Sequence, residues 1–219
     1  MDNNNIYTIK LNSNHLAKWI RYLFITLLVS YFFGTFANLI EKIDDTSAFA
    51  VIIVLKFIQY CVDLVSAYCL LKLSQIEKLF EKAALLEVIF VVTNIITLFI
   101  PEYKMILLPN EILALMMIIP STFAIYSEYL EHKGFHNLLI GLEDTLAKKW
   151  HTLWYIYLVS SVLLLFVGLS ALSSINNIES GFESILFGTL ISSIGVIIHF
   201  VYKLVVLNKS AKFFQNMEI

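Results

Sequence analysis

Along the chain, long apolar runs alternate with short breaks that are charged or rich in turn-forming residues. Six runs come close to the roughly 20 residues that a helix needs to cross about 30 Å of hydrocarbon. They cover residues 19–40, 48–71, 83–101, 105–127, 152–174 and 182–205. The short alternating segments typical of membrane β-strands do not appear, and a helix satisfies its own backbone in lipid. The pattern predicts an all-α integral membrane protein, a bundle of six transmembrane helices in a single membrane domain over 1–219.

Composition supports this class of protein. Of the 219 residues, 59% are hydrophobic and 15% are charged, whereas about a quarter of the residues in a soluble domain are charged. So much apolar surface would promote aggregation in water, but it can face lipid. The net charge of −2 gives no sign of a nucleic-acid partner. The predicted partner is therefore the lipid bilayer.

The basic residues predict an orientation. Lys42 and Lys104 fall on one side of the predicted helices, and Lys56 falls within a span. The other twelve lie on the opposite side: Lys10, Lys18, Arg21, Lys72, Lys78, Lys82, Lys133, Lys148, Lys149, Lys203, Lys209 and Lys212. Because basic residues concentrate in cytoplasmic loops, both termini are expected in the cytoplasm. The fourteen lysines against a single arginine suggest an AT-rich bacterial genome, and hence a bacterial plasma membrane.

The longest predicted connection contains an amphipathic pattern over residues 134–150. Its apolar residues recur at spacings of three and four, and they are Phe135, Leu138, Leu139, Leu142, Leu146 and Trp150. This spacing predicts a helix lying in the cytoplasmic interface between the fourth and fifth spans. Two interpretations remain open. The helix is an elbow leading into the fifth span, or it docks a cytoplasmic or membrane protein partner such as an ATPase.

An internal parallel repeat is a further hypothesis. Residues 15–80 resemble residues 146–214, and within them residues 26–80 align at a constant offset of 134. Phe32, Gly34 and Ala37, for example, match Phe166, Gly168 and Ala171. Parallel repeats occur in membrane transporters.

Polar residues inside the predicted spans are candidates for function, because an ionisable group in hydrocarbon is costly and usually faces protein or water. Lys56, Gln59 and Asp63 lie on nearly one face of the second span, and Glu111 lies in the fourth. Lys56 and Glu111 share a depth and have opposite charges, so we predict that they pair. The pair either fixes helix packing, or it lines a substrate or ion pathway together with Gln59 and Asp63.

Other ionisable residues have simpler interpretations. Glu87 and His199 lie near the predicted inner interface, where their side chains can reach the headgroup region. Glu128, His132 and His136 repeat at intervals of four, which would align them as metal ligands on a continuous helix. Gly134 and the predicted exit from the bilayer argue against that continuity. We therefore expect a solvated corner there, and no metal or cofactor.

The function expected from these features is a small transporter or permease-type membrane subunit. An accessory, assembly or immunity-type membrane protein without transport activity is the alternative, because each feature also has a packing explanation. An intramembrane enzyme is the third candidate. It ranks last because the sequence has no nucleophile–base pair or phosphate-binding loop, and no catalytic residue is predicted.

Overall fold

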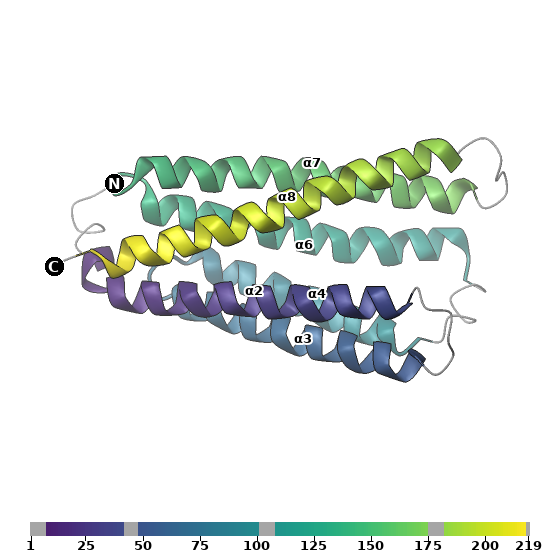
Figure 1. The fold of residues 1–219 in the computed structure, drawn as a ribbon, viewed down its shortest axis with the longest axis horizontal. Helices are drawn as coiled ribbons and strands as arrows, with labels where there is room; N and C mark the ends of the chain where they lie inside the picture. The colour runs from purple at the N-terminus through teal and green to yellow at the C-terminus, as the bar shows by residue number, and fades with distance from the viewer. Residues whose placement is uncertain (1–7, 42–47, 101–107, 175–181, 218–219) are drawn as a thin grey trace.

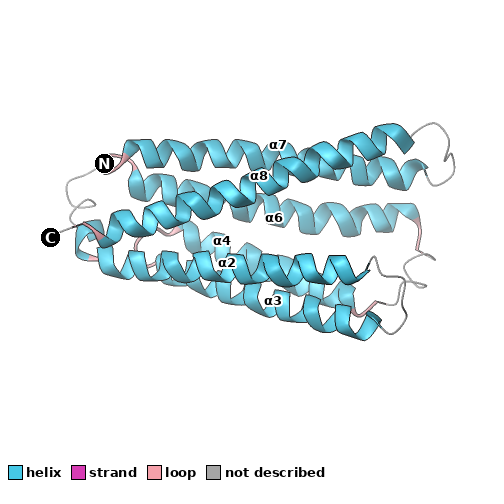
Figure 2. Cartoon of the chain, in the orientation of Figure 1, coloured by secondary structure: helices cyan, strands magenta, loops and turns pink. Residues whose placement is uncertain are grey.

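The computed structural model describes residues 8–41, 48–100, 108–174 and 182–217, and every regular element in these ranges is a helix (Figures 1 and 2). The long helices are α2 (Ser13–Glu41), α3 (Ala48–Leu73), α4 (Leu79–Leu98), α6 (Asn110–Leu139), α7 (Asp144–Ser174) and α8 (Phe182–Gln215). Each predicted span overlaps one of them. The predicted breaks that carry Lys42 and Lys104 lie outside the described residues.

Five of these helices are long and apolar enough to cross a membrane, and α4 is not among them. The five segments are Ser13–Glu41, Phe49–Leu73, Asn110–Leu139, Asp144–Ala171 and Ile185–Gln215. The 20 residues of α4 include three charged ones, Glu81, Lys82 and Glu87. The sequence therefore correctly predicts an all-helical chain with several apolar helices suited to a membrane.

The long helices form a closed ring. Each packs against the next along the chain, from α2 through α3, α4, α6 and α7 to α8, and α8 packs back against α2. They run along a common long axis in Figure 1. The pairs α2–α3 and α7–α8 are both extensively packed, which is compatible with the internal repeat; that repeat stays a prediction.

A hydrophobic core lies toward the end of the ring where α2 begins and α8 ends. Phe80 of α4 packs edge-on against Phe135 of α6, with ring centroids 4.9 Å apart. Phe135 in turn stacks on Trp150 of α7 at 4.1 Å. The indole Nε1 of Trp150 donates to Ser210 Oγ of α8 at 3.1 Å. These fully buried rings therefore join four helices at one level.

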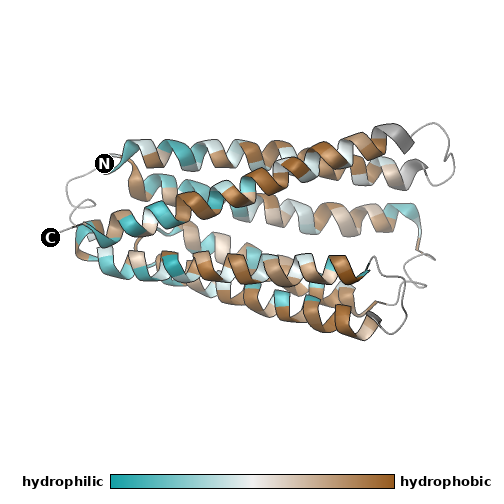
Figure 3. Ribbon diagram, in the orientation of Figure 1, coloured by the Kyte–Doolittle hydropathy of each residue, from teal (hydrophilic) through white to brown (hydrophobic). Residues whose placement is uncertain are grey.

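Large apolar side chains cover much of the remaining helix surface. Phe32, Phe99, Phe166 and Phe187 are between 63% and 67% exposed. Hydrophilic residues gather toward the end where α8 finishes, and hydrophobic residues dominate farther along the helices (Figure 3). A surface of this kind suits contact with hydrocarbon better than contact with water.

Residues 134–150 do not form the single interfacial helix predicted from the sequence. Helix α6 runs to Leu139, and α7 begins at Asp144. Between them Gly141 adopts a positive φ of 76°, a conformation that glycine adopts at far lower cost than other residues. The Gly141 N–H donates to Asp144 Oδ1 at 2.7 Å.

Most apolar residues of this segment face the interior of the ring, whereas Ile140 is exposed and Leu142 is half-buried. Phe135, Leu138, Leu139, Leu146 and Trp150 are all buried. Their periodicity reflects core packing at the end of α6 and the start of α7. Gly141 was the signal in the sequence, because glycine commonly follows the end of a helix.

Gly134 does not interrupt α6. A Cβ atom placed on it would lie 2.9 Å from the Phe80 ring of α4. Glycine thus allows that ring to pack directly on the backbone of α6, and the helix continues for another turn to Leu139.

Candidate functional site: an acidic cavity

A cavity of about 250 Å³ lies inside the ring, and all six long helices contribute to its lining. Its polar lining includes Ser30 of α2, Asp63 of α3, Glu87 of α4, Glu128 of α6, Tyr157 of α7 and Lys203 of α8. Residues far apart in the sequence meet here because the ring is closed. This cavity is the strongest candidate for a functional site.

The charged lining residues lie at a similar level along the ring. Glu87 is eight residues from the start of α4, Asp63 ten from the end of α3, and Lys203 twelve from the end of α8. At about 1.5 Å per helical residue, these positions are roughly 12–18 Å from the helix ends. The site is therefore well inside the ring and not at its rim.

Lys203 holds two carboxylates. Its ammonium nitrogen donates to Glu128 Oε1 at 2.5 Å and to Glu131 Oε2 at 3.0 Å. The other Glu131 oxygen, Oε1, is buried and has no hydrogen-bond partner among the described residues. Leaving a buried acceptor unpaired costs about 1–3 kcal/mol, and more for a charged group. Glu131 Oε1 is therefore the carboxylate oxygen here that can accept a further hydrogen bond or contact a cation.

Negative groups outnumber positive ones around the cavity. Asp63, Glu87, Glu128 and Glu131 provide four carboxyl groups, and Lys203 provides one ammonium group. Their formal charge is −3 when all are ionised. Because charges buried away from water need compensation, this lining favours the entry of protons or a cation.

The polar residues of α3 that the sequence singled out face α2. Ser30 Oγ donates to Asp63 Oδ1 at 2.5 Å. Gln59 packs so closely on Gly34 that a Cβ there would lie 2.8 Å from Gln59 Oε1. Both Gln59 and Asp63 also line the cavity. Two of the four predicted polar residues thus reach the candidate site.

Lys56 and Glu111 do not form the ion pair predicted from their depth. Lys56 Nζ instead lies 2.9 Å from Glu41 Oε2 at the end of α2, and Glu111 is exposed at the start of α6. Depth along a helix does not specify its neighbour, and α3 packs extensively on α2 and α4. The partner of Lys56 therefore comes from the adjacent helix of the ring.

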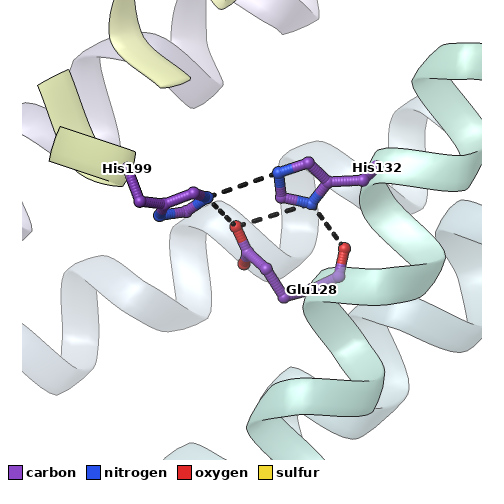
Figure 4. Close-up of side chains that lie close together, drawn as sticks. All are labelled: Glu128, His132 and His199. Atoms are coloured by element: carbon purple, nitrogen blue, oxygen red, sulfur yellow. Dashed lines mark hydrogen bonds and ion pairs between the residues drawn. The ribbon is translucent and has the colours of Figure 1, made fainter. Parts of the chain in front are cut away.

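Two histidines, His132 and His199, lie beside Glu128 (Figure 4). His199 Nε2 of α8 is 3.3 Å from His132 Nε2 of α6 and 3.5 Å from Glu128 Oε1. His132 Nδ1 lies 2.6 Å from the backbone oxygen of Glu128. Glu128, His132 and His199 each offer one potential metal-ligand atom, and these three atoms lie within 4.8 Å of one another. Both histidines are buried.

His136 does not join this cluster. Four residues advance a helix about 40° beyond one full turn. The side chain of His136 therefore points away from the direction of Glu128 and toward α7. There His136 Nδ1 is 3.1 Å from the backbone oxygen of Ala147. Its ring lines a second pocket of about 450 Å³, which also borders His132 and His151.

Several important residues received a different interpretation from the sequence. Glu87 and His199 were expected to reach the headgroup region, but they face the interior of the ring. Lys203 was counted only as one of the flanking basic residues, and Glu131 was not singled out. The spacing of four between His199 and Lys203 places them on one face of α8, but only the ring shows that this face meets α6.

No protein-family profile, curated protein or solved structure matches the chain. Function is therefore argued from the chemistry of the cavity alone.

Proposed function

We propose that the chain is a small multi-pass membrane transporter that binds a cation in the acidic cavity during transport. The observation that carries this proposal is a cavity lined by all six long helices, with an excess of carboxylates. Ionisable residues within membrane helices are expensive and typically mark substrate or ion pathways. The unpartnered Glu131 Oε1 provides a site where a proton or cation gains a hydrogen bond or an ionic contact.

In this proposal all six long helices cross the plasma membrane of a bacterium, and both termini are cytoplasmic. Glu87 supports the inclusion of α4, because its side chain lines the cavity and does not need to face lipid. The other two charged residues of α4, Glu81 and Lys82, lie within its first four residues. The one-sided distribution of basic residues supports the orientation.

Fusions of a topology reporter test this orientation. A reporter placed after residue 45 is expected outside the cytoplasm, and one placed after residue 140 inside it. A cytoplasmic signal from residue 45 would overturn the arrangement.

If the chain were an accessory or assembly protein without transport activity, we would expect the interior of the helix ring to be filled by side chains. The 250 Å³ cavity and its excess negative charge favour transport over that alternative.

Flux measurements in proteoliposomes test the function. The purified chain is reconstituted with an internal pH dye to follow protons, an internal Na⁺- or K⁺-sensitive dye, or internal calcein to follow Co²⁺. We expect the wild type to move at least one of these cations faster than protein-free liposomes do. Rates equal to those of empty liposomes for every probe would overturn the proposal.

Two variants link any flux to the cavity. Glu87→Gln and Glu131→Gln each remove one carboxylate from the lining, and we expect at least a tenfold slower flux. Glu81→Gln on α4 is the matched control, because Glu81 is exposed. Equal losses of flux in Glu81→Gln and Glu87→Gln would show that the flux does not depend on the cavity.

A further inference from the structure

The geometry of Glu128, His132 and His199 matches the ligand set of a tetrahedral metal ion. With metal–nitrogen distances of about 2.05 Å, two ligand atoms in a tetrahedral complex lie about 3.3 Å apart. The Nε2 atoms of His132 and His199 are separated by 3.3 Å. Glu128 Oε1 lies 3.5 Å from His199 Nε2. Glu128 Oε1 also lies 3.7 Å from His132 Nδ1. Because one ligand atom from each residue lies within 4.8 Å of the others, a modest change of side-chain torsion angles would bring the three groups around one ion (Figure 4).

The hydrogen bond of His132 leaves the correct nitrogen free to bind. Its Nδ1 lies 2.6 Å from the Glu128 backbone oxygen, which can only accept, so Nδ1 must carry the proton. In the neutral ring Nε2 then has a lone pair, and it faces His199. Metal-binding histidines commonly donate their second N–H to a carbonyl or carboxylate in this way.

Lys203 is compatible with such a site. It is one donor to Glu128 Oε1, and a carboxylate offers about four lone-pair positions over its two oxygens. Lys203 therefore orients Glu128 without exhausting its capacity to bind metal. A divalent ion would also reduce the formal charge of the cavity lining from −3 to −1.

We infer that Glu128, His132 and His199 bind a divalent transition-metal ion of the Zn²⁺ type. Two imidazoles and one carboxylate suit such ions, whereas Mg²⁺ and Ca²⁺ prefer oxygen ligands alone. Three protein ligands leave a fourth position open, which suits an ion that must later be released. The inference rests on the proposed function only in making this ion the transported cation; binding itself does not depend on transport.

The site lies between two cavities. Glu128 lines the acidic cavity, and His132 lines the second pocket of about 450 Å³ together with His136 and His151. The proposed ligands thus border both cavities. In the absence of metal, the His199 Nε2–H can donate to His132 Nε2. Metal binding shifts the neutral His199 ring to the tautomer that carries its proton on Nδ1, which leaves the Nε2 lone pair for the ion.

Titration with Co²⁺ tests the inference. Tetrahedral Co²⁺ has intense visible absorption, so the tag-free full chain in mild detergent is titrated with Co²⁺ and then with Zn²⁺ as a competitor. We expect one Co²⁺ per chain with a tetrahedral spectrum that Zn²⁺ abolishes. Binding of less than about a tenth of an equivalent at tenfold excess Co²⁺ would overturn the site.

Substitutions locate the ion. His132→Gln and His199→Gln are each expected to weaken binding at least tenfold. His151→Gln is the matched control, because His151 is exposed at the second pocket. His199→Cys keeps a metal ligand at this position, and it should retain Co²⁺ with a new thiolate-to-metal charge-transfer band. An equal loss in His151→Gln, or a His199→Cys spectrum identical to that of the wild type, would contradict the assignment.

Binding and flux separate the two proposals. Co²⁺ binding in detergent without cation flux in liposomes would uphold the metal site and overturn the transport function. Flux of protons without Co²⁺ or Zn²⁺ binding would uphold transport and overturn the metal site.

Discussion

The ammonium nitrogen of Lys203 lies 2.5 Å from Glu128 Oε1, and both side chains are largely enclosed by the ring of helices. Lys203 also donates to Glu131. One cation thus holds two carboxylates that come from successive turns of α6. Removing one partner of a buried ion pair is more damaging than replacing all partners by neutral groups, because the remaining charge has no compensation.

We expect Lys203→Met to lower the free energy of unfolding by roughly 3–5 kcal/mol, because it leaves Glu128 and Glu131 without their shared donor. Chemical unfolding in detergent micelles measures the loss. Lys209→Met on the same helix is the matched control and should change stability little, since Lys209 is exposed.

Neutralising the carboxylates should recover much of this loss. In the triple variant Lys203→Met, Glu128→Gln and Glu131→Gln, neither carboxylate that Lys203 holds is left charged without it. A triple variant that is less stable than Lys203→Met alone would show that the lysine acts mainly through packing of its aliphatic stem.

The Trp150–Ser210 hydrogen bond gives a second prediction. Trp150 is fully buried, and its Nε1–H donates to Ser210 Oγ at 3.1 Å. Ser210→Ala removes the acceptor and leaves the indole donor buried without a partner, so we expect a loss of about 1–3 kcal/mol. Trp150→Phe combined with Ser210→Ala provides the double-mutant cycle. A loss in Ser210→Ala that persists unchanged on the Trp150→Phe background would rule out this hydrogen bond as its cause.

Gly134 gives a third prediction, because its backbone supports the Phe80 ring. A Cβ at position 134 would lie 2.9 Å from that ring, and overpacking of this kind typically costs 1–3 kcal/mol. We expect Gly134→Ala to destabilise the chain despite the higher helix propensity of alanine. Phe80→Leu should make the Gly134→Ala substitution less costly. An equal cost on both backgrounds would contradict the proposed contact.

The helices are predictable from the sequence because their signal is strong and local. In lipid, a long apolar run such as residues 19–40 can satisfy its backbone hydrogen bonds within itself only as a helix. Helix α2 overlaps this run. Hydrophobic periodicity does not show whether an apolar stripe near a helix end packs in the protein core or lies on the membrane surface. The stripe from Phe135 to Trp150 predicts an interfacial helix by spacing alone, but Gly141 divides it between α6 and α7.

The site is less predictable because it depends on how distant helices associate. Asp63 and Gln59 stand out as polar residues in an apolar run, and both reach the cavity. His199 and Lys203 lie near the end of their apolar run. From the sequence, side chains that reach the headgroup region explain these polar residues as well as a buried site does. Only the closure of the ring, with α8 packed on α2 and α7, turns these side chains toward Glu128.

The position of Lys56 gives the last prediction. Its ion pair with Glu41 is partly exposed at both side chains, and exposed pairs usually contribute about 0.2–1 kcal/mol. We therefore expect Lys56→Gln to cost less than about 1 kcal/mol, far less than Lys203→Met. Exchanging the charges of Lys56 and Glu41 should restore the stability that either single reversal loses. Exchanging the charges of Lys56 and Glu111 should restore no stability, because the partner of Lys56 is Glu41 of α2 and Glu111 belongs to α6. Double-mutant cycles of unfolding in micelles measure both coupling energies. A larger coupling energy for Lys56 with Glu111 than for Lys56 with Glu41 would contradict the packing of α3 against α2.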